Sequence, residues 1–144
     1  MKTALGYKLL TEGAQVPSYS SAHAAGADLF ADEELLIGPG KWALIKTGIA
    51  LEIPVGYEVQ IRSRSGLALK SGISVLNAPG TIDSDYRGEI GVILMNHNDY
   101  VYHVHKGDKI AQMVIAQHET AYFFSQDELS TTERGQGGFG STGK

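Results

Sequence analysis

Alternation of apolar and polar residues with a period of two is the feature that most constrains this chain. In residues 57–62, YEVQIR, the apolar Tyr57, Val59 and Ile61 alternate with polar side chains, which is the pattern of a strand with one buried face. The segments with the same character are 48–53, 88–95, 100–104 and 109–117. Turn sequences such as GPGK, PVGY and HKGD separate them. Many short strands at close spacing predict an all-β sandwich, jelly roll or barrel rather than repeated βαβ units.

Two stretches depart from this alternation. Residues 65–72, SGLALKSG, predict a short helix with Ser65 at its start and Gly72 at its end. From about Thr131 onward the chain is rich in glycine and polar residues, which predicts a flexible arm. We therefore expect one β domain over residues 1–130 and a C-terminal arm over residues 131–144.

The composition excludes several kinds of chemistry. The chain has 144 residues, a formal net charge of −4 and no cysteine. Disulfides, thiolate metal sites and a cysteine nucleophile are therefore excluded. No large basic field is available to hold a nucleic acid, so we expect any phosphate handled here to belong to a small molecule. No stretch approaches the roughly 18 apolar residues of a membrane span, and we expect a cytoplasmic or other reducing intracellular location with no membrane partner.

Two familiar phosphate-binding patterns occur near the C-terminus without the context that they need. Gly135, Gly137 and Gly140 spell G-x-G-x-x-G, and residues 138–144, GFGSTGK, spell most of a Walker A loop. Neither is followed by the helix that gives those motifs their function, so we interpret both as coincidental. Closely spaced glycines nevertheless leave backbone N–H groups free to surround an anion.

His103 and His105 lie on one face of a predicted strand, which makes a metal site conceivable. The sequence shows no cysteine and no carboxylate pair near them. The favoured interpretation is therefore that both are surface or partly packed histidines.

Residues 62–68, RSRSGLA, place Arg64, Ser65 and Gly66 where a strand ends and a helix begins. Free N–H groups at a helix start, together with a guanidinium group, can bind an anion. An N-cap beside a solvent-exposed arginine explains the same residues equally well, so this segment alone does not decide between the two.

Residues 80–92, GTIDSDYRGEIGV, place Asp83 and Asp85 two positions apart. In an extended segment both carboxylates point the same way and can position a water, a proton acceptor or a cation. Taken alone, an Asx-rich turn before a strand is the favoured interpretation. Just upstream, residues 72–80 read as a strand that enters a tight Pro-Gly turn, whose backbone can recognise the edge of a planar base.

Taken in order, these segments resemble the five motifs of homotrimeric dUTP pyrophosphatases, the dUTPase family. The matching segments are AGADL (25–29), RSGLA (64–68), NAPGTIDSDYRGEI (77–90), KGDKIAQMVI (106–115) and RGQGGFGSTG (134–143). The chain departs from the family pattern at Ala27, Ser63 and Lys109. Lys109 stands where arginine is common, and we expect it to soften an ion pair near the site.

The resemblance implies a distorted β jelly-roll or barrel subunit with one short helix and a flexible C-terminal arm. It also implies a homotrimer in which the arm of one subunit closes over the active site of another. The implied reaction is Mg²⁺-dependent hydrolysis of dUTP to dUMP and pyrophosphate, which removes dUTP and supplies dUMP for thymidylate synthesis.

The resemblance further implies roles for individual residues. Asp83 matches the carboxylate that orients and deprotonates the water attacking the α-phosphorus. Asp28 matches an acidic residue that contacts the metal through water, and Tyr86 matches the ring that lies against the deoxyribose. The implied contacts to the phosphates are Arg64, Ser65, Gly66 and Gln112, and the implied contacts to uracil are Asn77, Thr81 and Ile82. The implied contacts from the arm are Arg134, Phe139, Gly140, Ser141 and Thr142, with Phe139 stacked on uracil.

Two other functions fit parts of the sequence. The related dCTP deaminases share the fold, but they match this chain less well in the third motif and in the glycine-rich tail. A regulatory binding module with the same scaffold would not need the intact Asp83 and tail.

Overall fold

The computed structural model describes residues 2–143, which contain eleven strands and one helix. The strands are β1 (Gly6–Leu9), β2 (Ser18–Tyr19), β3 (Ala27–Phe30), β4 (Leu35–Ile37), β5 (Trp42–Glu52), β6 (Tyr57–Arg62), β7 (Ile73–Val75), β8 (Gly80–Ile82), β9 (Glu89–Asn96), β10 (Tyr102–Val104) and β11 (Lys109–Gln117). The helix is α1 (Ser65–Ser71). None of the helices in the described part of the chain is long and apolar enough to cross a membrane.

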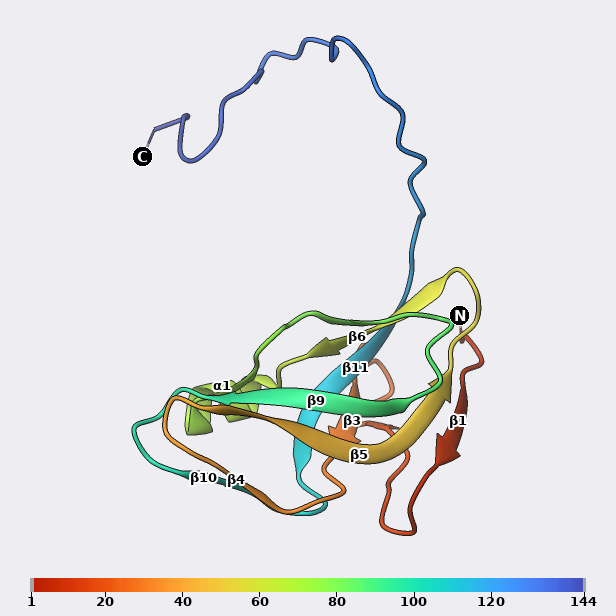
Figure 1. Ribbon diagram of the computed structural model, residues 1–144, viewed down its shortest axis with the longest axis vertical. Helices are drawn as coiled ribbons and strands as arrows, with labels where there is room; N and C mark the ends of the chain where they lie inside the picture. Colours follow the sequence, from red (N-terminus) through yellow and green to blue (C-terminus); the bar gives the residue numbers. More distant parts are fainter. Residues whose placement is uncertain (1, 144) are drawn as a thin grey trace.

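Two larger antiparallel sheets and one small sheet form the body of the molecule (Figure 1). One sheet has the strand order β1-β5-β9-β7, the second has the order β2-β3-β11-β6-β8, and β10 pairs with β4. Buried side chains from both larger sheets meet in a single apolar core. The expectation of an all-β jelly roll with one short helix is confirmed.

Strand β9 shows how the alternation produces this arrangement. Ile90, Val92 and Leu94 are buried in the core, and the residues between them are only partly buried. Because successive side chains of a strand point to opposite faces, one face of β9 is left for other contacts. That outer face forms one wall of the candidate site described below.

The alternation expected over residues 48–53 is kept on the core face of β5. Ile49 and Leu51 belong to the apolar core, while Ala50 between them is buried but does not join that cluster. The pairing of β5 with β9 shifts register in this stretch, and Gly48 adopts a φ of 70°. Glycine tolerates that backbone conformation, which other residues adopt only under strain. The bulge therefore bends the strand without changing which side chains face the core.

Several strands are too short for the alternation to reveal them. β1, β2, β4 and β8 contain only two to four residues each, whereas β7 lies inside the strand expected within residues 72–80. In addition, β10 begins at Tyr102, two residues later than expected. A segment of fewer than two full periods carries too few apolar positions to be distinguished from a loop.

The predicted helix is confirmed, with Ser65 at its start and Gly72 at its end. Gly72 ends α1 in the left-handed conformation, with a φ of 61°. Ser65 is the first helical residue, while Arg64 occupies the N-cap position and makes no side-chain capping bond. The first N–H groups of α1 are therefore not capped by a side chain.

A buried amide fastens the loop after β9 to the loop after β4. Asn96 is fully buried, and its Nδ2 group donates hydrogen bonds to the carbonyl oxygens of Ile37, Gly38 and Tyr100 over 2.8 to 3.2 Å. Its Oδ1 atom accepts hydrogen bonds from the backbone and side-chain amides of Asn98. One side chain thus satisfies backbone groups from separate segments.

After β11 the chain leaves the body. Residues 118–143 contain no helix or strand and extend away from the sheets (Figure 1). The extended segment, here called the arm, begins before the boundary expected at residue 131. Its upstream part carries exposed aromatic side chains, namely Tyr122, Phe123 and Phe124.

Removing the Asn96 amide should destabilise the fold. We expect Asn96→Ala to lower the free energy of unfolding by about 2 to 4 kcal/mol, because buried carbonyl and amide groups lose their partners. Chemical denaturation at a fixed protein concentration measures this loss. The nearby exposed residue Asp99 provides the control, and we expect Asp99→Ala to change stability by less than about 0.5 kcal/mol. An equally small effect of Asn96→Ala would contradict the structural role of the amide.

Candidate functional site

The structure divides the candidate residues into three groups that do not meet within one chain. The first group lines a cavity beside Asp83, here called the Asp83 pocket. The second surrounds the buried Asp28 and is called the Asp28 network. The third lies on the arm, whose residues 132–142 enclose a hollow of their own.

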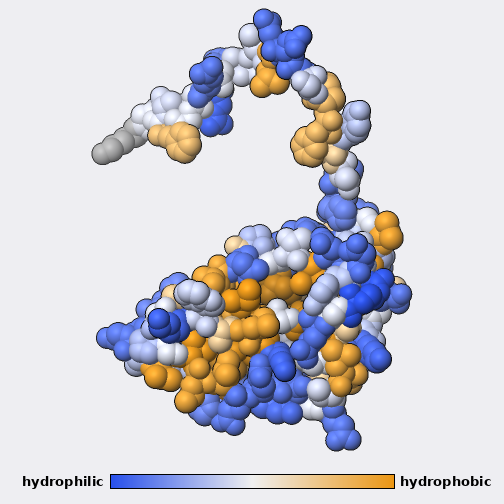
Figure 2. Space-filling view, viewed as in Figure 1, coloured by the Kyte–Doolittle hydropathy of each residue, from blue (hydrophilic) through white to orange (hydrophobic). Residues whose placement is uncertain are grey.

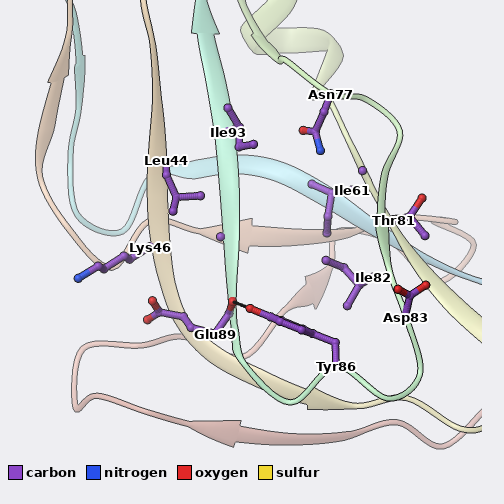
Figure 3. Close-up of a pocket in the computed structure, with 12 residues that line it drawn as sticks. Leu44, Lys46, Ile61, Asn77, Thr81, Ile82, Asp83, Tyr86, Glu89 and Ile93 are labelled. Atoms are coloured by element: carbon purple, nitrogen blue, oxygen red, sulfur yellow. Dashed lines mark hydrogen bonds between the residues drawn. The ribbon is translucent and has the colours of Figure 1, made fainter.

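The Asp83 pocket is a cavity of about 360 Å³ between β8 and the outer face of β5 and β9 (Figure 3). Its size lies within the range of small-ligand sites. Its lining comprises Leu44, Lys46, Ile61, Asn77, Gly80, Thr81, Ile82, Asp83, Tyr86, Glu89, Gly91 and Ile93. The expected residues Asn77, Thr81, Ile82, Asp83 and Tyr86 are thus brought together.

Close packing of β8 against β6 positions the wall that carries Asn77. Gly80 pairs with Ile61 in the register of β6 and β8. A Cβ atom at Gly80 would lie 3.3 Å from both the Asn77 amide nitrogen and the Ile61 side chain. The glycine therefore lets the Asn77 side chain approach the strand closely.

A hydrogen bond and a glycine orient Tyr86 at the other end of the pocket. The Tyr86 hydroxyl donates to the carbonyl oxygen of Glu89 over 2.9 Å. A Cβ atom at Gly88 would collide with that hydroxyl, so glycine is required for the ring to lie where it does. Asp83 is exposed beside the cavity, and its carbonyl oxygen accepts a hydrogen bond from the Tyr86 amide, which closes the turn between them.

Part of the pocket was missed by the sequence analysis. Leu44 and Lys46 come from β5, and Glu89 and Ile93 come from β9. Leu44, Lys46 and Ile93 belong to no motif, and Glu89 lies in the third motif without an expected role, so only the strand register places these residues opposite Asn77. Alternation indicates that such residues face outward, but it does not indicate what they face.

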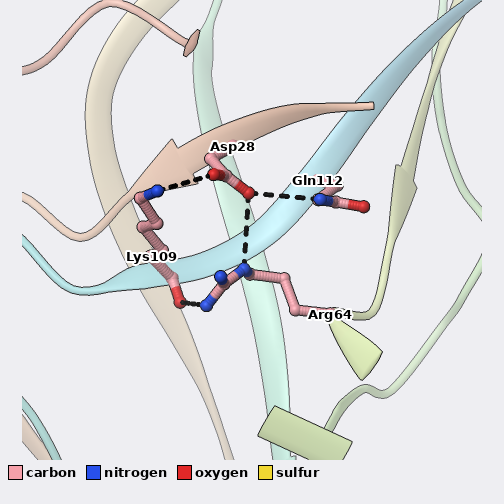
Figure 4. A network of polar contacts seen from close by, with 4 residues as sticks. All are labelled: Asp28, Arg64, Lys109 and Gln112. Carbon is pink, nitrogen blue, oxygen red and sulfur yellow. Dashed lines mark hydrogen bonds and ion pairs between the residues drawn. The ribbon is translucent and has the colours of Figure 1, made fainter. Parts of the chain in front are cut away.

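The Asp28 network joins three segments around one buried carboxylate (Figure 4). The Asp28 side chain is 2% exposed, and its Oδ1 atom lies 3.3 Å from Nε of Arg64. Its Oδ2 atom lies 3.0 Å from Nζ of Lys109, and the Gln112 amide donates to Oδ1 over 3.2 Å. Arg64 also donates to the Lys109 carbonyl oxygen over 3.1 Å. The expected residues Asp28, Arg64 and Gln112 are thus brought together.

Opposing influences act on the pKa of Asp28. Burial alone raises it, because burial disfavours the charged carboxylate. Hydrogen bonds from Lys109 and Gln112 and the positive charges of Arg64 and Lys109 outweigh burial, so the pKa lies below its ordinary value of 3.8. The carboxylate is therefore charged at neutral pH and balances the two cations.

A glycine leaves room for this network, and two residues that depart from the family pattern have partners in or near it. A Cβ atom at Gly26 would lie 3.0 Å from Oε1 of Gln112, so the glycine leaves room for the amide beside Asp28. Lys109, expected to soften an ion pair, forms that pair at 3.0 Å. Ser63, another departure from the family pattern, accepts a hydrogen bond from the Val75 amide over 2.8 Å.

The start of α1 next to this network is open. Ser65 and Gly66 are exposed, and a Cβ atom at Gly66 would meet nothing within 4 Å. The alternative in which a side chain caps this helix is wrong, because Arg64 at the N-cap makes no capping bond. The open N–H groups and the Arg64 guanidinium can together receive an anion.

The arm residues lie apart from both other groups. Arg134 donates from Nε to the carbonyl oxygen of Gly137 over 2.8 Å, which closes a local turn. Phe139 is fully exposed and adopts a φ of 52°. Gly140, Ser141 and Thr142 line only the hollow within the arm itself. In a single chain these residues have no contact with the Asp83 pocket.

Comparisons with known proteins identify the family. The dUTPase family model matches residues 12–143. The deoxyuridine 5'-triphosphate nucleotidohydrolases of Nautilia profundicola and Clostridium tetani are each 56% identical to this chain over 140 residues, which covers 97% of this chain and 99% and 97% of those proteins.

Solved structures agree with this family. The dUTPase of Staphylococcus bacteriophage 80alpha with dUPNHPP has a TM-score of 0.92 and is 32% identical, with 99% of this chain and 100% of that one covered. A mutant dUTPase from phage phi11 of S. aureus, whose structure reveals the coordination of a structural Mg(II) ion, has a TM-score of 0.82 and is 29% identical to this chain. The match covers 88% of this chain and 98% of the phage protein. On the fold, the site and these matches, the chain belongs to the dUTPase family.

Proposed function

We propose that this chain hydrolyses dUTP to dUMP and pyrophosphate at a site assembled from several copies of itself. The observation that carries the proposal is an exposed carboxylate, Asp83, beside a nucleoside-sized cavity in a member of the dUTPase family. The related protein of Staphylococcus bacteriophage 80alpha was solved with dUPNHPP, a nucleotide ligand.

The Asp83 pocket would hold the nucleoside. Asn77 and the backbone near Thr81 and Ile82 offer donors and acceptors for the edge of uracil, and apolar side chains of β5 and β9 line the opposite side of the pocket. Buried polar groups that stay unpaired with the wrong base give strong discrimination, about 10⁴ to 10⁵ in favourable cases. The Tyr86 ring would lie against the deoxyribose and exclude a ribose hydroxyl.

The Asp28 network would hold the phosphates. The Nε group of Arg64 pairs with Asp28, and one terminal nitrogen donates to the Lys109 carbonyl oxygen. The remaining N–H groups of the guanidinium are therefore available to phosphate oxygens. Ser65 and Gly66 add the open helix start, and Gln112 adds an amide. Asp28 holds Arg64 in place by direct contact and thus acts as a positioning residue.

The separation of the three groups favours a site shared among three copies. Neither Arg64 nor any arm residue lines the pocket that contains Asp83. Apolar side chains gather on the body beside β5 and β9 (Figure 2). On β5 the large side chains of Trp42 and Leu44 are exposed. An apolar patch of this kind is typical of a surface covered by another protein chain. A homotrimer would bring the pocket, the network and the arm of different subunits together.

Mg²⁺ would be bound mainly by the substrate's phosphate oxygens rather than by Asp28. The two cations beside Asp28 disfavour a third at the same carboxylate. Mg²⁺ commonly retains waters and binds phosphate oxygens, so the triphosphate itself would supply most of its ligands. When bound, the ion would neutralise charge that develops on the phosphates.

Asp83 would act as the general base for the attacking water. Displacement at phosphorus depends chiefly on placement and charge stabilisation, and a positioned base adds about 10² to 10⁴ in rate. Arg64 and the helix start would stabilise negative charge on the phosphates, and the arm would exclude bulk water once it closes. The proton from the water would pass to the Asp83 carboxylate.

A mixed-trimer experiment tests the shared site. Asp83→Asn and Arg64→Ala should each reduce kcat by a factor of about 10² or more. Trimers reassembled from equal amounts of the two variants should recover about a quarter of the wild-type activity, because that fraction of sites draws both intact residues from different subunits. Pyrophosphate release from dUTP measures the recovery.

The same mixture distinguishes the alternatives. Sites built within one chain would recover no activity, because every chain carries one defect. Wild-type turnover by Asp83→Asn alone would remove Asp83 from the mechanism. Wild type taken through the same procedure provides the control for losses during reassembly, and each variant mixed with itself gives the background activity.

Phe139 on the arm should contribute by stacking on the base. Stacking of a base on an aromatic ring is worth about 1 to 3 kcal/mol, so Phe139→Ala should lower kcat/KM for dUTP about tenfold to a hundredfold. Phe139→Tyr retains the ring and should remain within about twofold of wild type. Equal activity of the alanine variant and wild type would show that the arm does not stack.

The charge of Asp28 should stabilise the fold at neutral pH. We expect Asp28→Asn to lower the free energy of unfolding by about 1 to 3 kcal/mol, because two cations lose their partner. Since the folded pKa lies below 3.8, the deficit should stay constant from pH 8 to about 5 and shrink only as the pH falls through the folded pKa. Denaturation across this pH range measures the deficit.

The exposed Asp85 supplies the matched control for this measurement. Asp85→Asn should alter stability by less than about 0.5 kcal/mol at every pH. A deficit of Asp28→Asn that grows below pH 5 would mean that burial dominates and that the pKa of Asp28 is raised instead.

A further inference from the structure

A cluster of metal-ligating side chains lies outside the three groups described above. Within residues 2–143, Glu34, His103 and His105 each direct one ligand atom to a common point, and these atoms lie within 4.8 Å of one another. None of the three lines the Asp83 pocket or contacts Asp28. The cluster therefore needs an explanation separate from dUTP hydrolysis.

The pairing of β4 with β10 creates the cluster. His103 lies opposite Leu36, and Val104 lies opposite Leu35. The next position along this ladder places His105 opposite Glu34. His103 and His105 are two residues apart and therefore project from the same face. The sequence suggests surface or partly packed histidines, because it shows no cysteine and no carboxylate pair near them, and the pairing of the strands supplies the carboxylate of Glu34.

The distances suit three ligands of one ion. Nε2 of His103 lies 2.6 Å and Nδ1 of His105 lies 3.7 Å from the same atom, Oε1 of Glu34. Ligand atoms about 2.1 Å from a tetrahedral ion are about 3.4 Å apart. The two imidazole centroids lie 3.8 Å apart. These side chains are 41% to 62% exposed, so small rotations can reach the ideal separation.

The surroundings leave the cluster free for a cation. The adjacent Lys106 turns away to pair with Asp32, with 3.2 Å between Nζ and Oδ1. The backbone N–H of His105 donates to Oδ2 of Asp108 over 2.8 Å, which fixes the turn that carries the imidazole. The backbone positions of the ligands are therefore set by the sheet and the turn rather than by the ion.

The donor atoms select the class of ion. Two imidazole nitrogens and one carboxylate oxygen suit Zn²⁺ and its neighbours Co²⁺, Ni²⁺ and Cu²⁺, whereas Mg²⁺ prefers oxygen ligands alone. We propose that Glu34, His103 and His105 form a surface site for one divalent transition-metal ion per subunit, with water completing the coordination. The bound ion links the start of β4 to the end of β10 and does not replace the Mg²⁺ that serves hydrolysis.

A binding measurement on the full-length assembled protein tests the site. Protein treated with a chelator and then dialysed is titrated with Zn²⁺ by calorimetry in the presence of excess Mg²⁺. Wild type should bind one Zn²⁺ per subunit. His105→Asn should weaken that binding at least about tenfold, and Glu34→Gln provides a second variant should the first fail to fold.

The exposed His118 provides the matched control, because it removes one histidine without touching the cluster. His118→Asn should bind Zn²⁺ as tightly as wild type. All of these variants should hydrolyse dUTP with Mg²⁺ at the wild-type rate, because no ligand of the cluster belongs to the catalytic groups.

Spectroscopy provides an independent readout. Co²⁺ in place of Zn²⁺ should give visible absorption bands in wild type and in His118→Asn, and these bands should be lost in His105→Asn and Glu34→Gln. Absence of a Zn²⁺ site in wild type would overturn the proposal and leave the cluster as an ion pair of histidine and carboxylate. Undiminished binding by both Glu34→Gln and His105→Asn would also overturn it, because the ion would then lie elsewhere.

Discussion

The buried charge of Asp28 is the constraint on which the proposed phosphate end of the site depends. A carboxylate that is 2% exposed cannot remain charged without partners, and Arg64 and Lys109 supply them. These partners come from the residue before α1 and from β11, while Asp28 itself lies in β3. Balancing one charge therefore fixes the relative positions of three segments. It also holds a guanidinium group at the open start of a helix, where an anion can be received.

Removal of Asp28 would leave two cations without their partner, yet the intact network contributes more to the geometry of the proposed phosphate site than to net stability. A buried ion pair gains little over well-packed apolar residues, because desolvation of the charges offsets their attraction. Its benefit lies in geometry. Arg64 is held at two points, by Asp28 and by the Lys109 carbonyl oxygen, so little conformational freedom remains to be lost when phosphate binds.

The sequence predicts the long strands and the motif residues of the candidate site, but not the shortest strands or the pocket residues outside the motifs. Alternation predicts β6, β9 and β11 closely, because each is long enough to show its period. It also finds the second half of β5, where the bulge at Gly48 leaves Ile49 and Leu51 in the core, but it fails in strands of two or three residues. The motifs identify Asn77, Asp83 and Tyr86. Residues such as Lys46 in the same pocket escape, because their relevance depends on strand register, which local patterns do not encode.

His103 and His105 also show that local sequence patterns do not reveal which residues of other strands lie beside them. Their spacing was visible in the sequence, but the carboxylate that completes the cluster comes from Glu34, far away along the chain. Ligand sets that span two strands depend on which strands pair, and that depends on the packing of the whole sandwich.

The extended conformation of the arm follows from the cost of ordering a segment that cannot fold by itself. Ordering a glycine-rich segment costs roughly 1 to 2 kcal/mol per residue, and the arm buries too little apolar surface to offset that cost. It therefore extends from the body, and Phe139 stays fully exposed. In the proposed site a bound nucleotide would change this balance, because its base would offer the ring a face to stack on and its phosphates would offer acceptors to Arg134, Ser141 and Thr142. Closure would then depend on substrate, so that water would be excluded only when there is a phosphate to hydrolyse. An arm stable enough to close without substrate would block entry to the site, which is why weak intrinsic folding suits its role.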